Sequence, residues 1–401
     1  MDTETLLKGV PENLKVVADI RFPGTDPNGK LLFGFGTSER VGEEARTLGA
    51  RSVLIVSDPA IVALGLQRAV VSALSASDIA CEVFSDITPE PNLECLIAME
   101  KVVRAGRFDA VIGFGGGSSM DVAKLAACVS ASEHTAEEIM RDGRLVTTKL
   151  PTILMPTTSG TGSEVSPYIV ASAGDRKLFI GTPYLYATIA LVDPLLTATM
   201  PARVTASTGL DALSHGVEGV CACLNPYTLA MAEKCVELIF RFLPRAVLDG
   251  KDLEARYHMS YAAVLGMLAY TQGGGLYAHS ASYELTTQKS LAHGAGCGLS
   301  LPYTLAYNFE YIGGILDAFQ TDINRSGVFR SENRRETVEC FSRLVREVGM
   351  PATLAEVGYA REDVEDFARA LVEKYHRARN PRSMSFEEAR ALAVNMLQGR
   401  L

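Results

Sequence analysis

The sequence lacks an excess of positive charge. It contains 38 Lys and Arg residues against 47 Asp and Glu residues, which gives a formal net charge of −9 at pH 7. Proteins that bind duplex nucleic acid or an anionic membrane surface present a basic face to the phosphates. We therefore predict neither a nucleic acid nor a membrane as a partner.

A signal peptide and a long apolar run are also missing. Residues 1–14 are acidic and show no apolar stretch after a basic start. The stretch between Arg256 and Glu284 is uncharged, but Gln272 and the run Gly273-Gly274-Gly275 interrupt it, and its most apolar part, residues 261–270, is ten residues long. A bilayer requires about 20 apolar residues, so we predict a buried helix here.

Paired cysteine motifs are absent too. The eight cysteines stand at irregular spacings, and only Cys221 and Cys223 are close in sequence. Two cysteines cannot supply a four-ligand metal site, so we expect reduced thiols, mostly in the core of a cytoplasmic protein. The chain does have 47% hydrophobic and 21% charged residues, the balance of a globular protein.

Strand and helix patterns alternate in the first half of the chain. Such alternation implies parallel strands with helical crossovers, the doubly wound α/β class. Shorter β-like runs follow at 165–171 and 188–192. The predicted strands are 52–57, 79–84, 109–113 and 150–155, and the predicted helices are 61–74, 93–105 and 119–130.

After Asp193-Pro194 the pattern becomes helical and β-branched runs almost disappear. A capping box, Ser385-x-x-Glu388, opens a last helix. We therefore predict an α/β domain over 1–196 and an all-helical domain over 197–401. The predicted helices of the second domain are 206–220, 229–243, 257–270, 336–348 and 364–375.

Two loops in the first domain have the composition of phosphate-binding segments. The run Gly113-Phe-Gly-Gly-Gly-Ser-Ser-Met-Asp121 follows a predicted strand and opens a helix, where glycines and free N–H groups suit a diphosphate. The segment 156–163 follows another strand and contains five hydroxyls and two glycines. Loops after parallel strands share one sheet edge. The alternatives are a tight turn with a serine cap and a plain polar loop.

Asp58 ends the first clear strand. A carboxylate there can accept hydrogen bonds from both hydroxyls of an adenosine ribose, and it repels a 2′-phosphate. Since Pro59 follows it, the alternative is an N-cap for the next helix.

Three of the six histidines stand out. The spacing Asp211-x-x-x-His215 puts a carboxylate and an imidazole on one helix face. His279 and His293 lie within or beside uncharged stretches, where a buried ionisable group needs a partner such as a divalent cation. Three imidazoles and one carboxylate suit Zn²⁺ or Fe²⁺. For each histidine taken alone, the alternative is a hydrogen-bonded core residue.

The order of these motifs resembles the iron-containing (group III) alcohol dehydrogenase family over nearly the whole chain. The matching motifs are Gly115 to Lys124, Pro156 to Glu164, Gly209 to His215, and His279 to Gly294, together with Asn380-Pro381-Arg382. The resemblance implies a Rossmann-like dinucleotide-binding domain, a helical metal-binding domain and an active site between them, an architecture shared with the related dehydroquinate synthases.

The resemblance also implies roles for particular residues. It implies that Asp211, His215, His279 and His293 bind the metal, Fe²⁺ or Zn²⁺. It also implies that Asp58 recognises the adenosine ribose and favours NAD over NADP. Relatives suggest a homodimer or larger homo-oligomer. The implied pyrophosphate contacts are Gly115, Gly116, Gly117 and Ser118, and further cofactor contacts are Thr157, Thr158, Thr161, Ser166 and Lys177.

One position departs from the common family pattern. Many relatives carry a second histidine four residues after the third ligand, where this chain has Tyr283. Tyrosine there resembles the subset that includes the hydroxyacid–oxoacid transhydrogenases. A phenol, with a pKa of about 10, is a poor base at neutral pH. Tyr283 is therefore a candidate for proton transfer, with packing beside His279 as the alternative.

These observations predict an NAD-dependent alcohol dehydrogenase that acts on a small primary alcohol or aldehyde. The metal acts on the substrate oxygen as a Lewis acid, and the nicotinamide carries the hydride. Three alternatives stay open. They are a transhydrogenase of hydroxyacids with tightly held nucleotide, an NAD- and metal-dependent lyase, and a non-catalytic nucleotide-binding protein.

Overall fold

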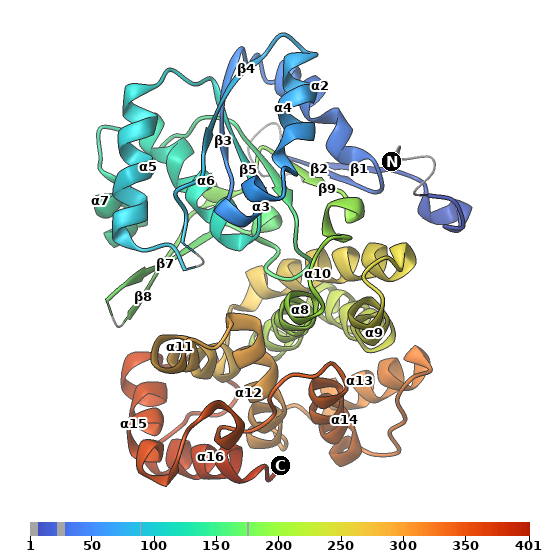
Figure 1. Cartoon of the computed structure of the whole chain (residues 1–401). Helices are drawn as coiled ribbons and strands as arrows, with labels where there is room; N and C mark the ends of the chain where they lie inside the picture. Colours follow the sequence, from blue (N-terminus) through green and yellow to red (C-terminus); the bar gives the residue numbers. More distant parts are fainter. Residues whose placement is uncertain (1–6, 22–28, 89, 175) are drawn as a thin grey trace. The chain divides into compact units, whose positions relative to one another are not determined.

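The computed structural model describes residues 7–21, 29–88, 90–174 and 176–401. The chain forms two compact units (Figure 1). Each unit has its own hydrophobic core. The first comprises the residues up to 158 together with 162–198, and the second comprises 159–161 and 199–401. The short segment 159–161, within the hydroxyl-rich loop, thus belongs to the helical unit.

The first unit is built on a seven-stranded sheet of order β1-β2-β9-β6-β5-β3-β4. All neighbours in it are parallel except β1 and β2, which pair antiparallel at one edge. The predicted doubly wound α/β class is therefore confirmed, with one antiparallel strand added. In sheet order the strands are β1 (Ala18–Arg21), β2 (Lys30–Phe33), β9 (Ile189–Val192), β6 (Thr152–Pro156), β5 (Ala110–Gly115), β3 (Ser52–Val56) and β4 (Ala80–Phe84).

Helices cover both faces of this sheet, with α2 and α4 on one side and α5, α6 and α7 on the other (Figure 1). The helix predicted over 61–74 is wrong as one element, because Gly65 adopts a left-handed φ of 72° and divides it into α3 and α4. A separate antiparallel pair, β7 (Tyr168–Ala173) and β8 (Arg176–Gly181), follows the sheet strand β6. The helices are α2 (Val41–Thr47), α3 (Pro59–Ala63), α4 (Gln67–Ser75), α5 (Leu93–Ala105), α6 (Gly117–Ser130) and α7 (Ala136–Arg141).

The second unit is entirely helical within its described residues. Its first three helices, α8, α9 and α10, pack on one another, and α12 packs against α8 and α11. The predicted capping box is present, with Ser385 and Glu388 exchanging hydrogen bonds at the start of α16. The helices are α8 (Ala202–Ala222), α9 (Pro226–Leu248), α10 (Leu253–Gly273), α11 (Tyr277–Lys289), α12 (His293–Tyr307), α13 (Gly313–Ser326), α14 (Arg334–Glu347), α15 (Val364–Arg369) and α16 (Phe386–Gln398).

The uncharged stretch before Glu284 is mostly helix α10 and the start of α11, and many of its side chains are buried in the unit's core. Across the described part of the chain, no helix has the length and apolar character needed to cross a membrane.

Candidate metal centre and nucleotide loops

Helix α8 supplies the first two side chains of the candidate metal centre. Asp211 and His215 are both buried and lie on one face of the helix, as their spacing predicts. Nε2 of His215 lies 3.8 Å from Oδ1 of Asp211. The pair therefore points one imidazole nitrogen at one carboxylate oxygen.

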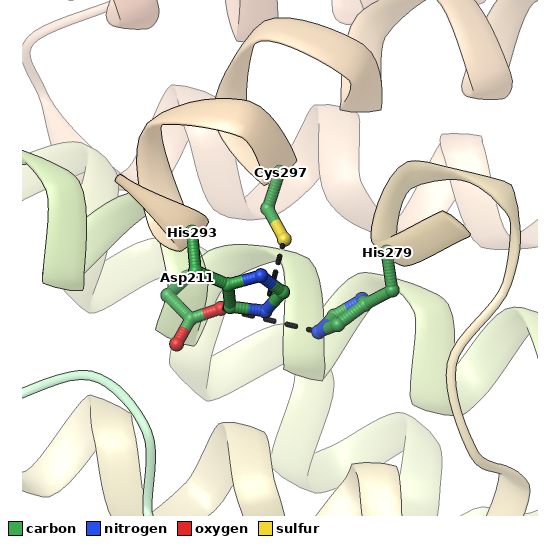
Figure 2. Close-up of side chains that lie close together, drawn as sticks. All are labelled: Asp211, His279, His293 and Cys297. Carbon is green, nitrogen blue, oxygen red and sulfur yellow. Dashed lines mark hydrogen bonds and ion pairs between the residues drawn. The ribbon is translucent and has the colours of Figure 1, made fainter. Parts of the chain in front are cut away.

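Helices α11 and α12 bring two more imidazoles to the same oxygen. Nε2 of His279 lies 3.9 Å from Oδ1 of Asp211, and Nε2 of His293 lies 3.6 Å from it. Figure 2 shows Asp211, His279 and His293 pointing toward one another from three different helices. Three imidazole nitrogens thus converge on a single carboxylate oxygen.

A glycine allows α12 to approach α8 this closely. A Cβ atom on Gly294 would lie 2.0 Å from the backbone oxygen of Ser207 and 2.9 Å from Cβ of Asp211. Any side chain at this position would push α12 away from α8. Because His293 precedes this glycine, the contact places its imidazole beside Asp211.

Hydrogen bonds orient two of the imidazoles with a lone pair toward Asp211. Glu218, one turn after His215 on α8, lies 2.5 Å from Nδ1 of His279 and also accepts from the backbone N–H groups of Leu276 and Ala278. Ser282 Oγ donates to the backbone oxygen of His293 and lies 2.9 Å from Nδ1 of the same residue. Both Nδ1 atoms therefore face acceptors, which places the lone pair of each ring on Nε2, the atom that faces Asp211.

The surroundings keep the imidazoles of His215 and His279 neutral at neutral pH. Burial lowers the pKa of His215 to about 4. Burial also lowers the pKa of His279 well below its usual value, and the neighbouring His215 lowers it further. Neutral imidazole is the form that binds a metal.

The donor atoms fit a divalent ion. Oδ1 of Asp211 and Nε2 of His279 are buried and have no hydrogen-bond partner among the described residues. A tetrahedral ion with ligand bonds of about 2.1 Å holds its ligand atoms about 3.4 Å apart, close to the 3.6–3.9 Å between the imidazole nitrogens and the carboxylate oxygen. Buried polar atoms without partners are costly, and a cation between them removes that cost.

Sequence reasoning missed Cys297. This buried residue lies one turn after His293 on α12, and its Sγ is 3.6 Å from Nε2 of His293 (Figure 2). Asp211, His279, His293 and Cys297 each offer a donor atom within 4.8 Å of the others. The signal was the spacing His293-x-x-x-Cys297, which repeats that of Asp211 and His215.

Tyr283 lies beside this cluster. Its ring stacks on that of His293, with ring centroids 5.4 Å apart and an interplanar angle of 19°. The guanidinium of the partly buried Arg377 lies 5.6 Å from the centroid of the Tyr283 ring. Burial raises the pKa of Tyr283, while the charge and hydrogen bond of Arg377 lower it. The phenol is therefore a hydrogen-bond donor at neutral pH, and it lies beside a cation that no sequence motif placed there.

In the first unit, three strand ends carry the predicted nucleotide loops. Asp58 follows β3, Gly115 ends β5 and Thr157 follows β6, and β5 lies between the other two strands. The N–H of Thr157 donates to the backbone oxygen of Gly115. Gly115 has a φ of 154°, and a Cβ there would lie 2.4 Å from Oγ of Ser119. The loops thus form one continuous edge, as parallel strands require.

Asp58 has both a structural contact and a position in this edge. Its Oδ1 accepts from the N–H groups of Ala60 and Ile61, so it is an N-cap of α3. Its Oδ2 accepts from Oγ of Ser119 at the start of α6, at 3.3 Å. Asp58 is therefore an N-cap, as the alternative interpretation predicted, and the same carboxylate also bonds to Ser119 beside the glycine-rich loop.

The other predicted cofactor residues differ in their surroundings. Gly116 is the N-cap residue of α6, followed in the helix by Gly117 and Ser118, and a Cβ on Gly116 would meet only Thr158, at 3.6 Å or more. Ser166 and Lys177 instead have protein partners. The buried Lys124 donates to Oγ of Ser166, and Lys177 pairs with Glu90 and donates to Ser172. Thr161 belongs to the helical unit.

A glycine-rich loop edge after parallel strands in one unit and a carboxylate–imidazole cluster in the other are the features expected of a metal-containing dehydrogenase. Residues 27–194 match the family model described as iron-containing alcohol dehydrogenase, and residues 205–396 match that for the C-terminal part of the Fe-containing alcohol dehydrogenase family. The chain belongs to the iron-containing alcohol dehydrogenase family, and it is an enzyme of that metal-containing type.

Individual relatives are similar to this chain over almost its full length. The sequence is 36% identical over 375 residues to long-chain-alcohol dehydrogenase 1 of Geobacillus thermodenitrificans, covering 90% of this chain and 93% of the relative. It is 29% identical over 376 residues to the NAD-dependent methanol dehydrogenase of Bacillus methanolicus, covering 91% and 97%. The crystal structure of sulfoacetaldehyde reductase from Bifidobacterium kashiwanohense in complex with NAD⁺ superposes with a TM-score of 0.83 at 28% identity, covering 91% of this chain and 96% of that one.

Proposed function

We propose that this enzyme transfers a hydride between NAD and a small primary alcohol or its aldehyde, with one divalent ion held by Asp211, His215, His279 and His293. The observation that carries this proposal is the convergence of three imidazole nitrogens, 3.6–3.9 Å away, on the buried Oδ1 of Asp211. When bound, the ion supplies Lewis-acid polarisation of the substrate oxygen, and NAD supplies the hydride chemistry. Nitrogen and oxygen donors of this kind suit iron and zinc.

The residues around the cluster have separate tasks. Glu218 and Ser282 fix the orientation of His279 and His293. His293 has 28% of its side chain exposed, whereas Asp211, His215 and His279 are 6% exposed or less. The cluster is therefore accessible to a substrate from the side of His293. Tyr283 stacks on that imidazole, so its hydroxyl is the candidate group to hold or release a proton near the substrate oxygen.

The activity is tested by following NADH while the enzyme is offered a panel of primary alcohols, aldehydes and oxoacids. The protein is prepared anaerobically with Fe²⁺ or with Zn²⁺. Net NADH formation from an alcohol, dependent on added NAD, supports the proposal. Exchange between a hydroxyacid and an oxoacid that persists without added NAD would instead indicate the transhydrogenase.

Replacement of Tyr283 by phenylalanine removes the hydroxyl and keeps the ring. We expect kcat to fall by about tenfold or more, toward the lower end of what general acid–base catalysis contributes, with metal content unchanged. Tyr375→Phe is a matched control, because Tyr375 packs against Tyr283 without stacking on a proposed ligand. If the Tyr283→Phe variant keeps the wild-type kcat from about pH 6 to pH 10, a range that reaches the phenol's ordinary pKa, Tyr283 is a packing residue.

Replacement of Asp58 by glycine tests the cofactor assignment. A carboxylate at the adenosine ribose repels the 2′-phosphate of NADP, so the wild-type enzyme should prefer NAD. In the variant, the ratio of kcat/KM with NAD to kcat/KM with NADP should be smaller. Because Asp58 also caps α3, the melting temperature is measured in parallel. Equal use of NADP and NAD by the wild-type enzyme would show that Asp58 does not select the cofactor.

We also propose a cytoplasmic enzyme that forms a homodimer or a larger homo-oligomer. All eight cysteines are free thiols in the structure, which supports a reducing compartment. The oligomeric state is inferred from the family alone and is measured by light scattering after size-exclusion chromatography.

A further inference from the structure

Cys297 is a buried thiol that contacts a proposed metal ligand. Its side chain is fully buried, and its Sγ lies 3.6 Å from Nε2 of His293. Asp211, His279, His293 and Cys297 form the one group of three or more candidate ligands found within the described residues. Oδ1 of Asp211 and Nε2 of His279, two donor atoms in this group, have no hydrogen-bond partner there.

We propose that Sγ of Cys297 is a further donor to the divalent ion and that it shifts the site's preference from Fe²⁺ toward Zn²⁺. The proposal rests on the metal centre of the proposed function. Thiolate sulfur is a soft ligand that zinc accepts readily at about 2.3 Å, and zinc can also expand to five ligands. Binding through sulfur releases the thiol proton to solvent.

The geometry of the cluster allows such a donor. Sγ of Cys297 and the donor atoms of Asp211, His279 and His293 all lie within 4.8 Å of one another. Glu218 is not a candidate for this ligand position, because its carboxylate is engaged by Nδ1 of His279 and by two backbone N–H groups.

Cobalt reports directly on a sulfur donor. Co²⁺ bound to thiolate gives an intense near-ultraviolet charge-transfer band that nitrogen and oxygen donors do not produce. We expect this band in the wild-type protein loaded with one Co²⁺ per chain. It should be lost in Cys297→Ser and Cys297→Ala, and kept in Cys340→Ser. Cys340 is a matched control because it is equally buried in the same unit and its Sγ bonds to the backbone oxygen of Arg330, outside the ligand cluster.

Metal competition gives a second readout. After anaerobic equilibration with equimolar Zn²⁺ and Fe²⁺, the ratio of bound zinc to bound iron should fall by about tenfold or more in Cys297→Ser, since even outer-shell changes alter metal affinity by about 10- to 100-fold. An unchanged ratio would overturn the proposal.

The outcomes separate this proposal from the proposed function. One Co²⁺ per chain without a sulfur band in the wild-type protein overturns the role of Cys297 and leaves the metal centre standing. A band that persists in Cys297→Ser also overturns it. Absence of bound Co²⁺ overturns both. The wild-type spectrum decides the matter even if neither variant folds.

Discussion

Replacement of His279 by alanine is expected to remove the metal ion and, with it, the dehydrogenase activity. The substitution deletes one of the nitrogens that face Oδ1 of Asp211 and leaves Glu218 without its imidazole partner. Changes in the outer shell of a metal site already cost about 10- to 100-fold in affinity or activity, so loss of a ligand should reduce kcat/KM by roughly 100-fold or more. Metal content is measured by elemental analysis and activity by NADH absorbance.

His258→Ala is the matched control for this change. His258 is also a helical histidine of the second unit, but it stacks on Phe242, away from the cluster. The control variant should retain one ion per chain. Stoichiometric metal in His279→Ala, with circular dichroism equal to that of the wild type, would contradict the ligand assignment.

Replacement of Glu218 by glutamine should weaken metal binding by about 10- to 100-fold while every proposed ligand remains in place. The carboxylate of Glu218 is the acceptor for three N–H groups, at distances of 2.5–2.9 Å. A glutamine side chain has one oxygen and two N–H donors, so one of these groups then faces a donor. The imidazole of His279 also loses the anionic acceptor that orients it.

The metal dissociation constant, measured by competition with a chelator, checks this prediction. Glu237→Gln is the control, because Glu237 is a buried glutamate of α9 that pairs with Lys234 and has no contact with the cluster. High metal concentration should restore activity to Glu218→Gln. An unchanged dissociation constant would show that Glu218 only stabilises the start of α11.

Periodic features of the fold were predictable from the sequence. The parallel strands and their crossover helices are encoded by local hydrophobic patterns, and α5 has the same bounds as the helix predicted over 93–105. Asp211 and His215 were placed together by helical spacing alone. The strand ends at Asp58, Gly115 and Thr157 were expected at one edge because parallel sheets impose it.

Other helices and strands show no clear hydrophobic periodicity in the sequence. Helix α12 begins with a glycine-rich segment that propensity disfavours, and it is held in place by packing against α8 at Gly294. Helix α11 is buried on nearly every face in its first nine residues, so it shows no polar stripe. Strands β1 and β2 are four residues long at the sheet edge, too short for a clear alternation.

The missed site residues are those whose role depends on helix crossings. Cys297 and Arg377 are distant in sequence from Asp211, and only the folded helices bring them near the cluster or its tyrosine. Glu218 is on the same helix as Asp211, yet its partner His279 comes from another helix. The spacing His293-x-x-x-Cys297 places the thiol on the helix face of His293, but its distance from Asp211 follows from tertiary packing, which local spacing does not encode.

The role of the metal is tested by titrating metal-free enzyme with Fe²⁺ or Zn²⁺ while bound metal and NADH formation from a primary alcohol are followed together. We expect activity to rise in proportion to bound metal and to saturate at one ion per chain. The quadruple variant Asp211→Ala/His215→Ala/His279→Ala/His293→Ala should neither bind the ion nor form NADH. Full activity in the metal-free wild-type enzyme would contradict this role of the metal.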